Sequence, residues 1–248
     1  MADAEALVKK SDLKVRAASA LVMVAVAGMA LWVGGWLWSA FVAVIAAGVL
    51  WEWWGLVCGF APRAVTRLRW MAGGLLYVGV AALLLALLPT MRGIGSGFLL
   101  PIVLAVIATD VGAYSAGRTF GGPKIAPLIS PSKTWSGLIG GMIGAGLALT
   151  FTIGVDCSFL DGSYEPTWFD CLTIDQWHGF KMSMLYGALI ASVAQAGDFF
   201  ESWMKRRAGV KDSGRLIPGH GGLFDRVDGL LAVCFVFGSM LLPDFFAA

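Results

Sequence analysis

Charged side chains are scarce in this chain of 248 residues. Asp, Glu, Lys and Arg make up 14% of it, whereas 58% of its residues are hydrophobic and its mean hydropathy is +0.78. This composition excludes an ordinary soluble domain. We therefore expect an all-α fold, a polytopic bundle of membrane-spanning helices forming one domain over residues 1–248. Membrane lipids, and no nucleic acid, are expected among its partners.

Cysteine is also rare. The four cysteines are too few and too scattered for a disulfide scaffold, and no CxxC pair or Cys/His cluster indicates zinc. Cys58 and Cys234 lie in apolar runs and are interpreted as packing residues. Cys157 and Cys171 share a loop that the charge pattern places outside the cytoplasm, so we hypothesise a disulfide between them.

Two common catalytic patterns are missing. No GxSxG nucleophile elbow is present, and the chain has only two histidines, so a Ser/His/Asp hydrolase is not indicated. A Walker A loop is excluded because Pro123, after Gly122, stands where its lysine would be. His178 falls in a predicted external loop, whereas His220 is either a phosphate donor or proton carrier, or only a turn residue.

Long apolar runs are abundant instead. They predict about seven spans, within a range of six to nine, since a run of roughly 20 residues crosses a bilayer. The runs cover residues 17–33, 36–58, 71–88, 98–116, 138–155, 180–200 and 230–246. Residues 1–16 are expected to form a cytoplasmic tail or an interfacial helix.

The basic residues are distributed unevenly between the predicted loops. All 18 except Arg92 and Lys181 fall in the N-terminal tail, the connection 61–70, the loop 118–133 or the loop 205–226. The loop 156–179 contains acids but no Lys or Arg. The positive-inside rule therefore places the N-terminus and the basic loops in the cytoplasm and the acidic loop outside.

The segment 198–229, between the last two spans, concentrates charge, histidine and glycine. Asp198, Ser202 and Lys205 recur at helical spacing on one face, with Asp198 predicted near the end of its helix. Asp225 and Asp228 open the next helix, where Asp228 is either a site residue or a benign acid at a helix N-terminus.

Two carboxylates near many cations favour one kind of chemistry. Asp198 and Asp225 are predicted to hold Mg²⁺ against a polyphosphate whose charge Lys and Arg neutralise, and a second metal ion is the alternative to a single one. The alternative is that the cations only anchor the chain to anionic lipid headgroups. A second polar segment, 110–137, lies on the same predicted side and brings further candidates: Asp110, Tyr114, Arg118, Lys124, Ser132, Lys133 and Thr134.

These residues resemble a known family. The pattern SxxKRxxxxKDxxxxxPxHGGxxDRxD from Ser202 to Asp228 resembles the signature of the CDP-diacylglycerol synthases, also called phosphatidate cytidylyltransferases. The resemblance extends to Asp110, to the segment 130–135 (SPSKTW) and to Glu52 with Trp53. One departure is Ser136, which stands where the family usually has Glu and cannot supply a carboxylate.

The resemblance implies condensation of CTP with phosphatidate to give CDP-diacylglycerol and pyrophosphate, at the cytoplasmic face of a bacterial inner (plasma) membrane. It implies that Asp198 and Asp225 bind metal and act in catalysis together with Lys205, Arg206, Lys211, His220 and Arg226. The expected substrate-binding residues are Arg118, Lys124, Ser130, Ser132, Lys133, Thr134, Ser202, Asp212, Gly221, Gly222 and Asp228.

Two other functions stay open at this point. A CTP-dependent enzyme acting on an ether lipid or a polyprenol would have the same metal-binding and phosphate-binding residues. An ion-coupled transporter could use the intramembrane acids Asp110 and Asp198 but would not need the basic, glycine-rich segment. The glycines of the fifth span, Gly140, Gly141 and Gly144 among them, let another helix approach closely, and a homodimer is a further possibility.

Overall fold

The computed structural model describes the backbone of residues 2–90, 95–159, 176–217 and 221–247. Within these ranges the chain is helical apart from short connections and one small hairpin. The elements are α1 (Ala2–Val33), α2 (Gly35–Phe60), α3 (Ala64–Leu87), the 3₁₀ turn η1 (Leu88–Thr90), α4 (Gly95–Phe120), β1 (Lys124–Ala126), β2 (Ser130–Thr134), α5 (Trp135–Phe159), α6 (Gln176–Ala208) and α7 (Phe224–Ala247).

Each predicted span has a helix at its position, so the helical fold is confirmed, whereas the number of membrane spans stays a prediction. Four of the described helices are long and apolar enough to cross a bilayer: Gly35–Phe60, Ala64–Leu87, Phe98–Phe120 and Trp135–Thr152. A shorter apolar helix covers Ala18–Val33. The turn predicted between the first two spans rests on Gly34 and Gly35, whose φ angles of 67° and 54° lie in the left-handed region that favours glycine.

One boundary differs from its prediction. Asp198 does not close its helix, because α6 continues to Ala208 through a polar tail ending in Lys205, Arg206 and Arg207. Basic side chains are favourable in the last turn of a helix, so the helix outlasts its apolar run. Only residues 209–223 therefore connect α6 to α7, and the carboxylate of Asp198 projects from a continuous helix.

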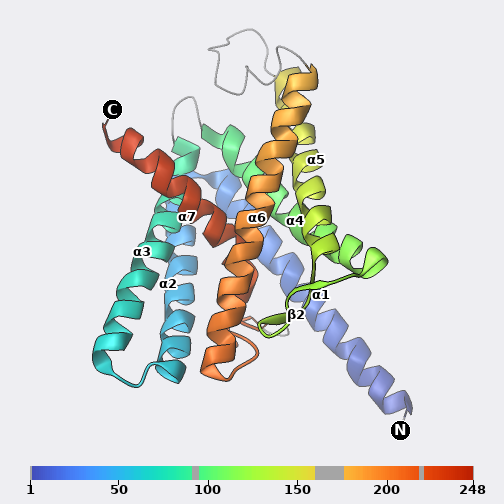
Figure 1. Cartoon of the computed structure of the whole chain (residues 1–248). Coiled ribbons are helices and arrows are strands. Elements are labelled where there is room, and N and C mark those ends of the chain that lie inside the picture. Colours follow the sequence, from blue (N-terminus) through green and yellow to red (C-terminus); the bar gives the residue numbers. More distant parts are fainter. Residues whose placement is uncertain (1, 91–94, 160–175, 218–220, 248) are drawn as a thin grey trace.

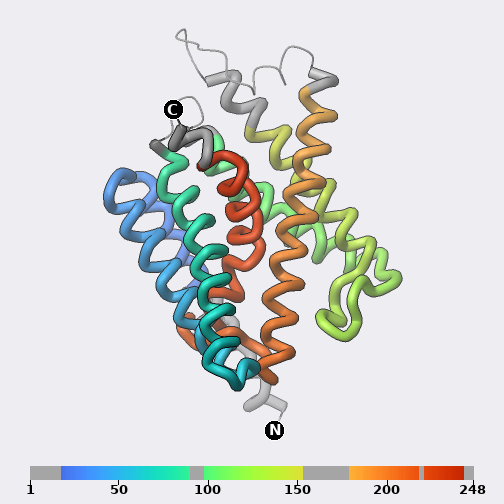
Figure 2. Tube along the Cα trace, turned by 60° about the vertical axis from the view of Figure 1, so that its left-hand side comes forward, coloured from blue at the N-terminus to red at the C-terminus, as the bar shows by residue number. Residues whose placement is uncertain are grey.

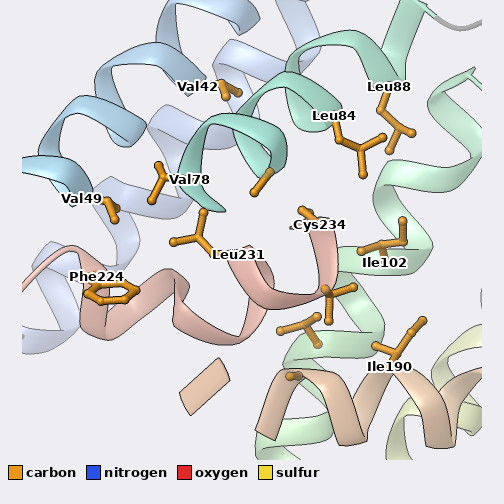
Figure 3. Close-up of a cluster of buried hydrophobic side chains, with 14 of the residues drawn as sticks. Val42, Val49, Val78, Leu84, Leu88, Ile102, Ile190, Phe224, Leu231 and Cys234 are labelled. Carbon is orange, nitrogen blue, oxygen red and sulfur yellow. The ribbon is translucent and has the colours of Figure 1, made fainter. Parts of the chain in front are cut away.

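Five helices share a buried core. Val49 of α2, Val78 of α3, Ile102 of α4, Ile190 of α6 and Leu231 of α7 belong to the same cluster (Figure 3). The two cysteines interpreted as packing residues are free thiols, with Cys234 buried in this cluster. The Cys157 side chain and Cys171 lie outside the described residues, so the disulfide remains a hypothesis.

The glycines of α5 serve packing within the chain. A Cβ at Gly140 would lie 2.6 Å from the carbonyl oxygen of Gly112 in α4, and one at Gly144 would lie 2.6 Å from that of Ala108. On another face of α5, Gly146 contacts Met184 and Gly187 of α6. These glycines allow α5 to lie close to α4 and α6 of the same chain. Because they serve contacts within the chain, they do not support a homodimer, which stays a prediction.

The connections that carry the basic residues gather at one end of the molecule. The α2–α3 connection, the β1–β2 hairpin and the end of α6 lie toward the same end in two different views (Figures 1 and 2). Helix α7 leaves this end and runs obliquely, packing against α3 and α6 (Figure 1). The fold therefore brings the two polar segments 110–137 and 198–229 together.

Candidate active site

A polar cavity of about 410 Å³ lies where α4, the hairpin, α6 and the start of α7 meet. It collects residues from both polar segments of the sequence. Its lining residues are Asp110, Ile129, Ser130, Asp198, Glu201, Ser202, Lys205, Arg206, Lys211, Asp212, Asp225, Arg226 and Asp228.

Helix α6 supplies one wall of the cavity. Asp198, Ser202 and Lys205 line it, as their helical spacing predicts. Glu201, three residues after Asp198, lines it too and is 1% exposed. Its Oε2 lies 2.5 Å from Nζ of Lys205, and its buried Oε1 has no hydrogen-bond partner among the described residues.

Asp225 is held by four donors at the beginning of α7. Its Oδ1 accepts a hydrogen bond from Nζ of Lys205 at 2.5 Å. Its Oδ2 accepts from the backbone N–H of Ser213 and of Gly222, each at 2.9 Å, and from Oγ of Ser213 at 3.0 Å. These bonds fix the carboxylate and hold Ser213 and Gly222 against the start of α7.

Residues 201–229 lie outside the predicted spans. In this region the surroundings affect the pKa values of two neighbouring carboxyls, Glu201 and Asp225, differently. Burial first, and then the adjacent Asp225, raise the pKa of Glu201 to about 9. Burial alone would also raise the pKa of Asp225, but the Glu201 carboxyl, the Lys205 ammonium and the N–H groups of Ser213 and Gly222 together hold it below its ordinary value. The pKa values of these two contacting carboxyls therefore move in opposite directions.

Three carboxyls of the cavity fit a divalent cation. Asp198, Glu201 and Asp228 each offer an oxygen within 4.8 Å of the others. Burial and the neighbouring Asp198 raise the pKa of Asp228 to about 8, so a bound cation would relieve their mutual repulsion. Carboxylate oxygens are the hard ligands that Mg²⁺ prefers, and Oε1 of Glu201 is available to accept one more partner.

The hairpin brings a cation to Asp198 of this wall, although Lys133 itself is not among the lining residues. Nζ of Lys133 on β2 pairs with Oδ2 of Asp198 and lies 4.9 Å from the ring centre of Phe199. Arg206 of α6 donates to the carbonyl of Ile129 at the hairpin tip, at 3.4 Å. The hairpin is thus attached to α6 at two points and closes one side of the cavity.

The sequence indicated a polar stretch here, not a hairpin. Gly121 and Gly122, with φ of 61° and 103°, turn the chain out of α4. Ser136 then donates to the carbonyl of Gly121 and lies 3.0 Å from Oγ1 of Thr134. Where the resembling family usually has a carboxylate, this chain has a hydroxyl that closes the base of the hairpin.

Several predicted substrate-binding residues do not line the cavity. The exposed Arg118 donates to the hydroxyl of Tyr114 at 2.6 Å, and Lys124 and Ser132 are exposed on the hairpin. Thr134 is buried, and its Oγ1 accepts from the N–H of Gly137 at the start of α5.

The predicted glycines support the site through the backbone. Gly222 donates its N–H to Asp225, and the carbonyl of Gly221 accepts from the N–H of Ile217 at 3.1 Å. His220 lies outside the described residues, so its role remains a prediction.

Two acids in the site region were not among the predicted site residues. Glu201 could have been found from its position three residues after Asp198 on the same helix. Glu52 belongs to an aromatic cluster of the second span and is far in sequence from the other acids. It is 3% exposed and accepts hydrogen bonds from Ser213, Leu223 and Phe224.

The Cytidylyltransferase family matches residues 54–242, which include every residue that lines the cavity. The chain belongs to this family. Curated relatives agree over most of its length. It is 37% identical over 228 residues to a phosphatidate cytidylyltransferase of Brucella abortus biovar 1 (strain 9-941), covering 86% of this chain and 76% of the relative.

Two further relatives carry the same name. The protein of Rickettsia bellii (strain RML369-C) is 32% identical over 224 residues, which cover 90% of this chain and 88% of the relative. The protein of Mycobacterium tuberculosis (strain ATCC 25618 / H37Rv) is 41% identical over 137 residues, 55% of this chain and 36% of the relative. As a cytidylyltransferase family member, the chain is a nucleotidyltransferase, and its polar cavity is the candidate active site.

Proposed function

We propose that this chain is a phosphatidate cytidylyltransferase, which condenses CTP with phosphatidate to form CDP-diacylglycerol and pyrophosphate. The observation that carries this proposal is the polar cavity, where acidic and basic side chains from two distant segments converge within the part of the chain that matches the family. A triphosphate needs both kinds of group, since cations neutralise its oxygens and carboxylates hold a divalent metal between them.

The metal site is proposed at the carboxyls of the cavity. Asp198, Glu201 and Asp228 are the proposed holders of Mg²⁺, on the strength of their converging oxygens. Asp225 keeps its predicted metal-binding role as a proposal, although four donors already engage its two oxygens. Bound there, Mg²⁺ would supply charge neutralisation for the phosphates of CTP.

The cations of the cavity have a separate proposed task. Lys205, Arg206, Lys211 and Arg226 line the cavity and can orient phosphate oxygens. An oxygen of the phosphatidate phosphate forms a new bond to the α-phosphorus of CTP, while the bond from that phosphorus to the oxygen bridging it to the β-phosphorus breaks. The electron pair leaves with pyrophosphate, whose growing negative charge these cations stabilise. No covalent enzyme intermediate is needed.

The proposed location follows from the distribution of charge. The basic connections lie toward one end of the bundle (Figure 1), which we assign to the cytoplasm, with about seven spans and a cytoplasmic N-terminus. The membrane would be a bacterial inner membrane, consistent with the bacterial relatives. CTP would then arrive from the cytoplasm and the diacyl substrate laterally from the bilayer.

A direct assay tests the proposal. Purified protein in lipid nanodiscs is incubated with CTP labelled in the cytidine, Mg²⁺ and phosphatidate, and the products are separated by chromatography. We expect label in the lipid fraction and an equal amount of released pyrophosphate.

Parallel reactions contain an ether-linked phosphatidate or a polyprenyl phosphate. If either lipid is turned over faster than phosphatidate, that lipid would replace phosphatidate as the proposed substrate. No lipid-bound cytidylate with any of the three lipids would contradict the proposed function.

A further inference from the structure

Glu52 is a buried acid that does not line the catalytic cavity. It projects from the middle of α2 and is 3% exposed. Its Oε1 accepts a hydrogen bond from the N–H of Leu223 at 2.9 Å, and its Oε2 accepts from the N–H of Phe224 at 2.8 Å and from Oγ of Ser213 at 2.9 Å. A carboxyl in this apolar core is costly unless partners of this kind compensate for its burial.

All three donors belong to the other end of the chain. Phe224 is the first residue of α7 and Leu223 directly precedes it, and their N–H groups are among those that a helix leaves without internal partners. The negative carboxylate also complements the positive end of the helix dipole. Glu52 therefore caps α7 from a different helix, about 170 residues away in sequence.

The fit around the Glu52 carboxyl is close. A Cβ at Gly214 would lie 2.6 Å from its Cδ, and a Cβ at Gly222 would lie 2.6 Å from its Oε2. The next residue, Trp53, packs its ring 5.7 Å from that of Phe224. Glu52 thus contacts the backbone at Gly214 and Gly222, and Trp53 packs against the side chain of Phe224 at the start of α7.

Ser213 links Glu52 to the active site. Its hydroxyl lies 2.9 Å from Oε2 of Glu52 and 3.0 Å from Oδ2 of Asp225, and its backbone N–H also donates to Asp225. The same carboxylate of Asp225 accepts from Gly222, which touches Glu52. The position of Asp225 therefore depends on backbone that Glu52 holds.

We propose that Glu52 is a positioning residue for the reaction. It holds Ser213, Gly222 and the start of α7 in place, and through Ser213 and Gly222 it sets the position of Asp225 in the cavity. It lies outside the matched segment 54–242, so a part of the chain beyond that segment contributes to the site. The consequence for turnover rests on the proposed function, whereas the contact with the α7 amides does not.

The substitution Glu52→Gln tests this role, because it preserves volume but leaves one acceptor oxygen. At least one of the N–H groups of Leu223 and Phe224 then faces an amide NH₂. We expect kcat with CTP and phosphatidate to fall by about tenfold to a hundredfold, which is the order of loss that a small misplacement of reacting groups produces. The KM for phosphatidate should change by less than about threefold, since bulk lipid binding does not involve this contact.

Two companion variants separate positioning from packing. Leu56→Ala removes a buried side chain one turn further along the same helix without removing an acceptor from the connection. It should lower the melting temperature at least as much as Glu52→Gln while the kcat of the folded fraction stays at the wild-type value. Ser213→Ala combined with Glu52→Gln should lose little more than Glu52→Gln alone, because both act on one network.

Hydrogen exchange of the intact protein in nanodiscs supplies a readout that needs no turnover. In Glu52→Gln, a peptide containing Leu223 and Phe224 should exchange its amides faster than in wild type, and in Leu56→Ala it should not. Unchanged exchange, wild-type kcat, or a kcat loss no larger than the unfolded fraction explains would each overturn the proposal. An inactive wild type with faster exchange in Glu52→Gln would contradict the function and leave the contact standing.

Discussion

Lys133 and Asp198 form an ion pair although 65 residues separate them in the sequence. One lies on β2 of the hairpin and the other inside α6. This pair joins the two polar segments at the wall of the cavity. It also places the Lys133 ammonium beside Asp198, a proposed metal ligand. A phosphate entering the cavity would compete with Asp198 for this ammonium.

Removing the cation of this pair should weaken CTP use more than folding. In Lys133→Met the KM for CTP is expected to rise by about tenfold, since a hydrogen bond to a charged group contributes roughly 1.5–3 kcal/mol. Steady-state kinetics with CTP varied at saturating phosphatidate measure this. Arg63→Ala, which removes a charge from the exposed α2–α3 connection, serves as the control and should leave the KM unchanged. Equal effects of both variants would mean that only overall charge matters.

Replacing Asp198 by Asn should abolish turnover while the protein remains folded. The change removes one carboxylate from the group it forms with Glu201 and Asp228, and the loss of a fixed charged group from a site costs on the order of a hundredfold or more in rate. Activity of Asp198→Asn and of wild type is measured after chelator treatment, over a range of added Mg²⁺ that extends well beyond wild-type saturation. A wild-type rate of Asp198→Asn at the Mg²⁺ concentration that saturates the wild type would contradict the proposed metal site.

Close packing of α4 on α5 should make Gly144 intolerant of a methyl group. Gly144→Ala would press its Cβ against the carbonyl of Ala108 and is expected to destabilise the fold by about 1–3 kcal/mol. Gly79→Ala in α3 is the matched control, because its Cβ would enter open space. Thermal unfolding in the same detergent compares the two, and a Gly144→Ala melting temperature at or above that of Gly79→Ala would contradict this packing.

The hydroxyl of Ser136 should matter through the hairpin that it closes. Ser136→Ala removes its bonds to Gly121 and Thr134 and is expected to cost about 0.5–1.5 kcal/mol of local stability. Because the same hairpin carries Lys133, we expect a severalfold higher KM for CTP. Ser239→Ala removes a hydroxyl that bonds only within its own helix, to Val236, and should behave as wild type. If the two variants have the same KM, Ser136 does not act through the hairpin.

Local spacing predicted which side chains of α6 lie together in the cavity. Asp198, Ser202 and Lys205 share a face of α6 because helical periodicity alone places residues three and four apart together. The same rule covers Glu201, which was not among the predicted site residues. The end of α6 was placed too early because hydropathy marks where a helix leaves apolar surroundings, not where its hydrogen bonds stop.

Contacts between distant segments could not be predicted in the same way. Glu52 stands among tryptophans in a run that satisfies every criterion for an ordinary span. Nothing local connects it with amides about 170 residues later, because the start of α7 reaches it only after α2, α6 and α7 have packed together. The pairing of Lys133 with Asp198 depends in the same way on the hairpin folding back onto α6.

The sequence by itself determined the class of the protein, the order of its helices and the identity of most polar residues in the cavity. Composition and period decide those features, since burial in lipid and helical geometry act on neighbouring residues. Only the tertiary structure decided which carboxyls converge, which amides Glu52 caps and which predicted residues, such as Arg118 and Lys124, stay away from the cavity. Those depend on how helices cross, and the crossings are set by close contacts such as Gly112 against Gly140, whose partners are far apart in the chain.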